Sequence, residues 1–344
     1  DAKLTLGGAA GAAAPASSTA SARAQARARA RAQRRALRSG PPPAPVNVSL
    51  RRVPAQGQYL PSGLFTDGER VALPLWSEAE PEAEPLWFVL DTAIRRTALS
   101  KSNAARLGVS DGLGVARGLR FAGEPVGDLS VQVVPDGSAV LGDGVSGLLG
   151  PDFLYGWDLD LDVARCRCAA WPAGPDLVSG FGPRDALEIE VQGSQGLLEV
   201  NAQLAGTVEV SEACGAKKAG RPLRAVVDLG QTYSACNWAA ARQLGLSGAG
   251  SPGVRPAGEW LDLDGRPIEV CEASLSVELS GRVSGVLQGV RVCEGRLFWI
   301  AETLPILERL GFNPAEPCAV LGLDTVGRSR LAVSARHRRL WLPV

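Results

Sequence analysis

Two segments of the chain share one layout, and this shared layout predicts the fold. Residues 86–109 read LWFVLDTAIRRTALSKSNAARLGV, and residues 223–246 read LRAVVDLGQTYSACNWAAARQLGL. The two segments align without a gap at an offset of 137 residues, which places Asp91 opposite Asp228. Self-similarity within a chain predicts a structural unit that occurs more than once.

Each copy has the pattern of a strand, a tight turn and a helix. The apolar runs Trp87–Leu90 and Ala225–Val227 predict buried strands. An aspartate ends each run, and small residues after it permit a turn. Ser100 and Asn237 stand where a helix N-cap is expected, and each copy has a glycine after its last helical leucine, where a left-handed residue ends a helix.

A second pair of segments repeats at an offset of 172 residues. Gly147–Leu154 reads GLLGPDFL and Ala319–Val326 reads AVLGLDTV. Each is an apolar pair, a glycine and a helix-like stretch, followed by a predicted strand at Leu159–Val163 or Leu331–Val333. The second half therefore carries 35 more residues between its two motifs. We expect Leu297–Leu310, which has helical apolar spacing, to form a helix that accounts for part of this excess.

The order of these motifs resembles the aspartic protease family. The turns are similar to its Asp-Thr-Gly turns, and Leu148–Leu154 is similar to the segment that closes a retropepsin-like lobe. Two lobes in one chain resemble the pepsin-like enzymes. The resemblance covers Val46–Val344 and implies a mainly β, bilobal fold, in which two related β-barrel-like lobes carry a few short helices. We expect lobe 1 at residues 46–182 and lobe 2 at 183–344, with the junction near Phe181–Pro183.

The resemblance also implies a chemistry. Asp91 and Asp228 would meet between the lobes and share one proton, because two carboxylates so close cannot both ionise easily. One would act as a base on a bound water while the other polarises a peptide carbonyl. The implied activity is that of an endopeptidase on a peptide or protein substrate in extended form. It requires no metal and no cofactor.

Both turns depart from the family pattern. The first reads Asp91-Thr92-Ala93 and lacks the glycine, and the second reads Asp228-Leu229-Gly230 and lacks the hydroxyl. In the family the hydroxyls bond across the lobes, so Thr92 is expected to lack a symmetric partner. Three interpretations stay open. The chain is an active endopeptidase, or it is a pseudoprotease that binds an extended peptide or a partner segment by strand addition without cleaving it. The third is a structural subunit whose lobes serve only as a scaffold.

Five other aspartates have simpler interpretations. Asp152 and Asp324 each lie two residues after the glycine of the second motif, a position that suits the start of a helix. Asp158, Asp160 and Asp162 alternate along a predicted strand and therefore share one face. We expect that face to be the solvated one.

A serine nucleophile and a flap are further candidates. Ser234 would need a base, and the only histidine of the sequence is His337. The retropepsin-like and pepsin-like families close the cleft with a hairpin, and Gly112–Val134 is the candidate here, with Gly123–Pro125 as its turn.

The composition of the chain limits the kinds of partner that we expect it to have. Lys and Arg number 36 and so do Asp and Glu, a balance that disfavours a general nucleic-acid binder. No run of 18 apolar residues occurs, so no membrane-spanning helix is expected. The seven cysteines are widely spaced and are expected to be reduced thiols. We expect a monomer.

The start of the chain differs from the rest. Residues 2–66 contain ten basic and no acidic side chains, and residues 22–38 consist largely of Ala and Arg. An acid-poor, Arg-rich leader resembles a transit peptide, so residues 1–45 predict targeting to a plastid or mitochondrion. The alternative is a disordered tail whose composition reflects GC-rich coding.

Overall fold

The computed structural model describes thirteen stretches of the chain. They are residues 44–54, 69–136, 141, 143–172, 186–192, 197–206, 219–261, 267–283, 287–302, 304, 307, 310–327 and 330–343. The predicted leader, apart from residues 44 and 45, lies outside them, as do the predicted junction Phe181–Pro183 and Cys214. We refer to the described residues 44–172 as the first half and to 186–343 as the second half.

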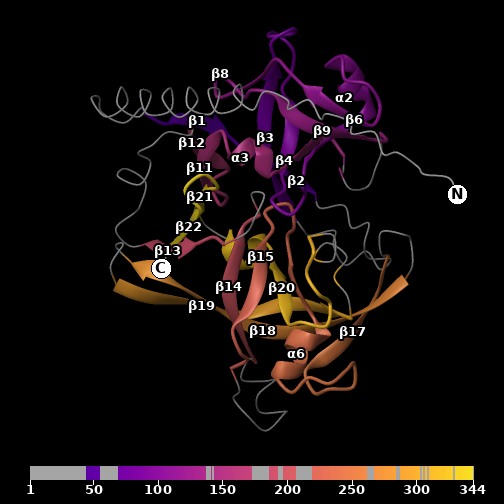
Figure 1. Ribbon diagram of the computed structural model, residues 1–344, viewed down its shortest axis with the longest axis vertical. Helices are drawn as coiled ribbons and strands as arrows, with labels where there is room; N and C mark the ends of the chain where they lie inside the picture. The colour runs from indigo at the N-terminus through magenta and orange to yellow at the C-terminus, as the bar shows by residue number, and fades with distance from the viewer. Residues whose placement is uncertain are drawn as a thin grey trace, which may run out of the picture. The chain divides into compact units, whose positions relative to one another are not determined.

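The fold is mainly β, and four short helices occur among the described residues (Figure 1). Two barrel-like sheets carry the strands. The first has nine strands, in the order β6-β9-β5-β10-β4-β3-β7-β8, with β2 paired to β3. These strands are β2 Arg51–Pro54, β3 Glu69–Ser77, β4 Leu86–Leu90, β5 Thr97–Ser100, β6 Leu113–Ala116, β7 Leu119–Phe121, β8 Glu124–Pro125, β9 Leu129–Val134 and β10 Gly147–Leu149.

The second sheet has thirteen strands and joins the two halves. Its order is β1-β12-β11-β21-β22-β13-β18-β14-β15-β20-β16-β19, with β17 paired to β18. Three strands of each half form the run from β1 to β13, which Figure 1 shows between the other strands of the two halves. The strands are β1 Val46–Ser49, β11 Trp157–Asp162, β12 Arg167–Pro172, β13 Ala186–Glu190, β14 Glu199–Gly206, β15 Leu223–Val227, β16 Ser234–Asn237, β17 Val254–Leu261, β18 Pro267–Val283, β19 Leu287–Ala301, β20 Cys318–Leu321, β21 Arg330–Ser334 and β22 Arg339–Pro343.

The repeated segments have the same pairing in both halves. In the first half β4 runs parallel to β10, β10 antiparallel to β5, and β5 parallel to β9. In the second half β15, β20, β16 and β19 repeat this pattern. The helices also correspond: α2 Lys101–Arg106 with α6 Trp238–Gln243, and α3 Pro151–Leu154 with α8 Leu323–Val326. The parallel strands are buried on both faces, which explains their continuous apolar sequences.

The predicted helix ends are confirmed. The Ser100 hydroxyl accepts a hydrogen bond from the Asn103 N–H at the start of α2, and the Asn237 side chain accepts one from the Ala240 N–H at the start of α6. Gly108 and Gly245 follow the two helices with φ of 67° and 84°. Both glycines therefore occupy the left-handed region that L side chains avoid.

The helix predicted at Leu297–Leu310 is wrong for its first part, because residues 297–301 belong to β19. Phe298 lies opposite Ser234 of β16 and opposite Ala273 of β18, so this segment is held between two strands. Tertiary pairing overrides the helical spacing of its apolar residues. Much of the extra length of the second half is the long β18–β19 hairpin.

The prediction that Asp158 and Asp160 face solvent is also wrong. Asp158 is fully buried and Asp160 is 8% exposed. Strand β11 lies inside the sheet, between β12 and β21, and Arg330 of β21 covers the Asp160 carboxylate in an ion pair. The alternation of polar residues identified the shared face correctly, but that face is covered.

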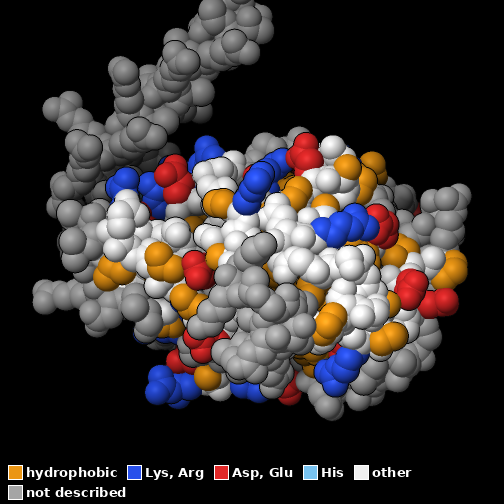
Figure 2. Space-filling model, turned by 90° about the horizontal axis from the view of Figure 1, so that it is seen from below, with side chains coloured by type: hydrophobic (Ala, Val, Ile, Leu, Met, Phe, Trp, Pro, Cys, Tyr) orange, Lys and Arg blue, Asp and Glu red, His pale blue; other side chains and the backbone are white. Residues whose placement is uncertain are grey.

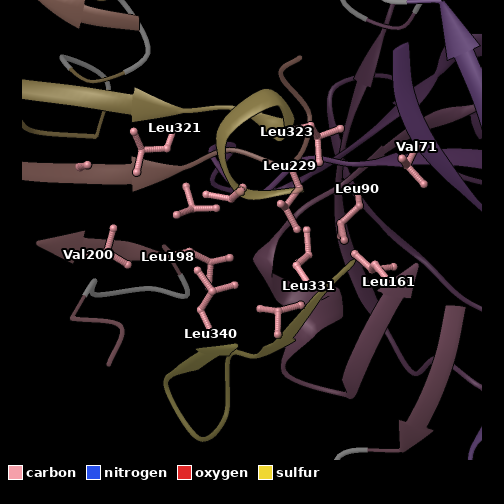
Figure 3. Close-up of a cluster of buried hydrophobic side chains, with 14 of the residues drawn as sticks. Val71, Leu90, Leu161, Leu198, Val200, Leu229, Leu321, Leu323, Leu331 and Leu340 are labelled. Carbon is pink, nitrogen blue, oxygen red and sulfur yellow. The ribbon is translucent and has the colours of Figure 1, made fainter. Parts of the chain in front are cut away.

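One large apolar cluster spans the two halves. Figure 3 shows Leu90 and Leu161 from the first half together with Leu229 and Leu331 from the second. On the face that Figure 2 shows, acidic and basic side chains are interspersed among single apolar ones. No helix of the described residues is both long and apolar enough to cross a bilayer.

Candidate active site

The two predicted aspartates lie together. Asp91 follows β4 and Asp228 follows β15, the equivalent strands of the two halves. The backbone N–H of Asp91 donates to the Leu149 carbonyl at 2.9 Å, and that of Asp228 donates to the Leu321 carbonyl at 3.0 Å. The two side-chain carboxyls lie within hydrogen-bonding reach of each other.

The two turns orient the carboxyls in the same way. The Ala93 N–H donates to Asp91 Oδ1 at 3.0 Å, and the Gly230 N–H donates to Asp228 Oδ1 at 2.8 Å. Each carboxyl is thus held by the backbone of its own turn, two residues later. The replacement of glycine by alanine at position 93 leaves this bond intact, because it comes from the backbone.

The hydroxyl of Thr92 connects the two halves. Thr92 Oγ1 donates to the Val227 carbonyl at 2.6 Å and accepts from the Leu229 N–H at 3.0 Å. Thr92 is fully buried, so both of these backbone groups depend on the hydroxyl for a partner. Its counterpart Leu229 is 2% exposed and packs in the apolar cluster that Figure 3 shows. The cross-connection is therefore one-sided, as the sequence predicted.

The third residues of the turns also differ. A Cβ added to Gly230 would lie 2.7 Å from Asp91 Cγ and 2.9 Å from its Oδ2. Only glycine allows the second turn to lie this close to the first carboxyl. Ala93 is 1% exposed, and it packs in a cluster of second-half side chains that includes Val226 and Trp299.

Burial and mutual repulsion set the protonation of the pair. Loss of solvent raises the pKa of Asp91, while nearby N–H groups and the charge of Arg70 lower it. Burial, and then the charge of Asp91, raise the pKa of Asp228 well above its usual value. Asp91 is half-buried whereas Asp228 is 5% exposed. Two carboxyls that interact in this way titrate as a coupled unit rather than independently.

A second pair of carboxyls supports the turns from behind. Thr97 Oγ1 donates to Asp152 Oδ1 at 2.9 Å, and Ser234 Oγ donates to Asp324 Oδ1 at 2.8 Å. Each hydroxyl also accepts a backbone N–H, that of Gly150 at 3.1 Å or that of Gly322 at 3.0 Å. Both aspartates lie in the first turn of a short helix, as predicted, but each glycine is the N-cap. Burial raises the pKa of both carboxyls.

Ser234 and His337 are not brought together in a hydrogen bond. The Ser234 hydroxyl bonds to Asp324 and lies 2.8 Å from Thr325 Oγ1. His337 Nδ1 lies 2.9 Å from the hydroxyl of another serine, Ser334. Ser234 thus has a structural part in the support of the second turn.

The predicted hairpin within Gly112–Val134 forms, with a shifted turn. Strands β7 and β8 pair through Ala122 and Gly123, whose φ values are 55° and 84°. Phe121 of β7 packs edge-on against Phe153 and Trp157 at centroid distances of 5.3 and 4.9 Å. Figure 1 shows β8 at the end of the first half that faces away from the second. Strand β7 therefore packs on the first-half core through Leu119 and Phe121, whereas both residues of β8 are exposed.

Sequence reasoning missed Arg70. It lies on β3, 8% exposed, and its charge acts on both aspartates. The strand before each repeat carried no motif, so no local signal marked this residue. Strand β3 pairs with β4, with Ala72 opposite Val89, and this register, continued past the end of β4, brings Arg70 level with Asp91.

The remaining candidate metal ligands are the cysteines and the His, Asp and Glu side chains. Six of the seven cysteines fall in the described residues, and all six are free thiols. Within the same part of the chain, no group of three or more His, Cys, Asp or Glu side chains could hold a metal ion. Comparison with protein-family models finds no match for the chain, and comparison with curated proteins finds no relative.

Proposed function

We propose that this chain is an aspartic-type endopeptidase with the bilobal aspartic protease fold, lobe 1 at residues 46–182 and lobe 2 at 183–344. One observation carries the proposal: Asp91 and Asp228 end equivalent strands of the two halves and bring their carboxyls within hydrogen-bonding reach. Two buried carboxyls are costly to hold together, and such pairs are typical of catalytic sites.

The proposed reaction uses the shared proton. The ionised carboxylate takes a proton from a water molecule as the water oxygen bonds to the peptide carbonyl carbon. The protonated carboxyl gives its proton to the carbonyl oxygen, which forms a tetrahedral intermediate. The first carboxyl then returns its proton to the peptide nitrogen, a hydroxyl of the intermediate returns a proton to the second carboxyl, and the C–N bond breaks, which leaves a carboxylic acid and an amine and restores the pair. No electrons are exchanged.

An extended peptide is the proposed substrate, because a strand presents its backbone to both halves at once. The full-length protein should be incubated with a mixed peptide library at pH 3.5 to 7. We expect cleavage by the parent and a loss of at least about 1,000-fold in the Asp91→Asn and Asp228→Asn variants, because the mechanism needs both groups. Asp111→Asn, at an exposed carboxylate paired with Lys101, is the matched control. Equal cleavage by the parent and the Asn variants would refute the assignment.

One observation favours a second candidate, a pseudoprotease that binds a peptide or partner segment. The hydroxyl connection between the turns is one-sided, because Leu229 packs in the core where a second hydroxyl would stand. A folded parent that cleaves no peptide at any pH, yet retains labelled peptides in equilibrium binding, would favour this candidate.

The proposed targeting of residues 1–45 to a plastid or mitochondrion has its own test. The amino terminus of the protein purified from its native cells should be determined by mass spectrometry. A terminus near residue 46 in organelle fractions is expected, and retention of the leader would contradict the proposal.

A further inference from the structure

The strand next to Asp91 carries a buried charge, Arg70. The equivalent position on the strand next to Asp228 carries no charged residue. In the β3–β4 pairing Ala72 lies opposite Val89, and continuation of this register by two residues, past the end of β4 at Leu90, brings Arg70 level with Asp91. Residues opposite each other in an antiparallel pair project to the same face. In the second half, Glu199 lies opposite Val226, and the same step places Leu197 opposite Asp228.

The guanidinium of Arg70 is fixed. Its Nη2 donates to the Leu141 carbonyl at 2.6 Å, and the side chain is almost fully buried. The preceding carbonyl, that of Glu69, accepts the hydroxyl of Thr232 from the second turn at 3.2 Å. Strand β3 is thereby anchored to both halves, and the charge of Arg70 stays close to the carboxyl pair.

The other charged groups around the pair are already engaged or point elsewhere. Glu69 is exposed and pairs with Arg52 at 2.6 Å. Asp152 and Asp324, from the short helices packed behind the turns, accept hydrogen bonds from Thr97 and Ser234. In the first turn, the side chains at positions 95 and 96 are exposed arginines. Among the described residues, Arg70 is the buried cation whose charge acts on both carboxyls.

We propose that Arg70 makes the carboxyl pair asymmetric, so that the negative charge resides on Asp91 and the shared proton on Asp228. Under the proposed function, on which this role assignment rests, Asp91 is the base that activates water and Asp228 is the acid that protonates the carbonyl. Arg70 is a positioning residue, because it acts through Asp91. The placement of the charge does not itself depend on catalysis.

Two properties of the pair agree with this assignment. Asp91 is the more exposed of the two, so its charged form loses less hydration. Burial and the neighbouring charge raise the pKa of Asp228 well above its usual value, whereas turn N–H groups and the charge of Arg70 oppose the effect of burial on the pKa of Asp91.

The test titrates each carboxyl by itself. Full-length Asp91→Asn leaves Asp228 as the only acid of the pair, and Asp228→Asn leaves Asp91. With 13Cγ-labelled aspartate, carbon NMR reports the pKa of the remaining carboxyl in each variant. The signal of that carboxyl is assigned as the one that disappears when the second aspartate is also replaced by Asn. We expect Asp91 to titrate at least about one pH unit below Asp228. Equal values, or the reverse order, would overturn the proposal.

Replacement of Arg70 then tests the cause. In the Asp228→Asn background, Arg70→Met should raise the pKa of Asp91 by about one unit or more, and Arg70→Lys should leave most of the difference. An unchanged pKa in a variant with a native thermal transition would overturn the role of Arg70. If Arg70→Met does not fold, the comparison of the two Asn variants still decides where the charge resides.

Activity separates this inference from the proposed function. In an active parent, Arg70→Met should move the acidic limb of the pH–rate profile to higher pH, because Asp91 must lose its proton to act as a base. If the parent cleaves nothing but the two carboxyls titrate apart, the endopeptidase proposal fails and the charge placement stands. If the parent cleaves peptides but the carboxyls titrate together, the reverse holds.

Discussion

The two turns that carry the carboxyl pair have one backbone geometry and two different means of support. In the first turn the Thr92 hydroxyl bonds to the backbone of the other half, whereas at the same place in the second turn Leu229 packs into an apolar core. In the first turn Ala93 is tolerated, whereas Gly230 lies directly against the carboxyl of Asp91. A backbone arrangement set by strand pairing can thus be kept while the side chains that stabilise it change.

The layer behind the turns is alike in the two halves. Thr97 with Asp152 and Ser234 with Asp324 make the same pair of hydrogen bonds at equivalent positions. The differences are therefore confined to the residues nearest the carboxyl pair. This contrast indicates that the frame is symmetric and that the environment of the two carboxyls is not.

The largest effect on stability should come from the one-sided hydroxyl. Thr92→Val keeps the shape of the side chain but leaves the Val227 carbonyl and the Leu229 N–H buried without a partner. Because each of these two groups costs about 1–3 kcal/mol, the free energy of unfolding should fall by about 2–6 kcal/mol in urea denaturation. Thr92→Ser, which keeps the hydroxyl, should lose less than half of that. An equal loss in both variants would show that packing, not the hydroxyl, holds the turns together.

The second-largest effect should come from the third residue of each turn, which is Ala93 in the first turn and Gly230 in the second. In Gly230→Ala the new Cβ would lie 2.7 Å from Asp91 Cγ, so the turn or the carboxyl must move. We expect a loss of about 1–3 kcal/mol in stability and, in an active parent, about 100-fold in kcat/KM from the displaced carboxyl.

The mirror variant Ala93→Gly is the matched control for this exchange. It removes one buried methyl group and leaves the N–H bond to Asp91, so kcat/KM should change only a few-fold. If Ala93→Gly impaired the reaction as strongly as Gly230→Ala, the two turns would be equivalent and the asymmetry would not matter.

The smallest effect concerns the strands that join the halves. Asp158 on β11 is fully buried, and burial raises the pKa of its carboxyl. A group whose pKa is higher in the folded state binds more protons there, so stability falls as pH rises from its unfolded value through the raised value. Asp158→Asn cannot ionise and should therefore be more stable than the parent at pH 7, by about 1 kcal/mol.

Calorimetry from pH 4 to 7 measures this difference. The parent should lose stability as pH rises, and Asp158→Asn should lose less. Asp111→Asn, at an exposed carboxylate, should follow the parent. A variant that is no more stable than the parent at pH 7, or that loses as much stability over this range, would indicate that the carboxyl of Asp158 keeps its charge at little cost inside the sheet.

Local patterns in the sequence determined the repeated unit. Apolar runs that end in an aspartate predicted β4 and β15, and the polar residue before each helix predicted its N-cap. These features depend on residues that are neighbours along the chain, so the sequence of one segment carries enough information. The repeat predicted equivalent positions for Asp91 and Asp228, whereas their meeting was predicted only by the resemblance to the aspartic protease family.

Only the tertiary structure decided which residues surround the pair and which faces are covered. The charge of Arg70 acts on Asp91 from a neighbouring strand, Asp158 is buried on a strand inside the thirteen-stranded sheet, and Phe298 is held in a strand by neighbours on both sides. Each of these outcomes depends on partners far away along the chain. Periodicity assigns residues to a common face of a strand, but solvent exposure and charge environment depend on what packs against that face, and local sequence does not encode this.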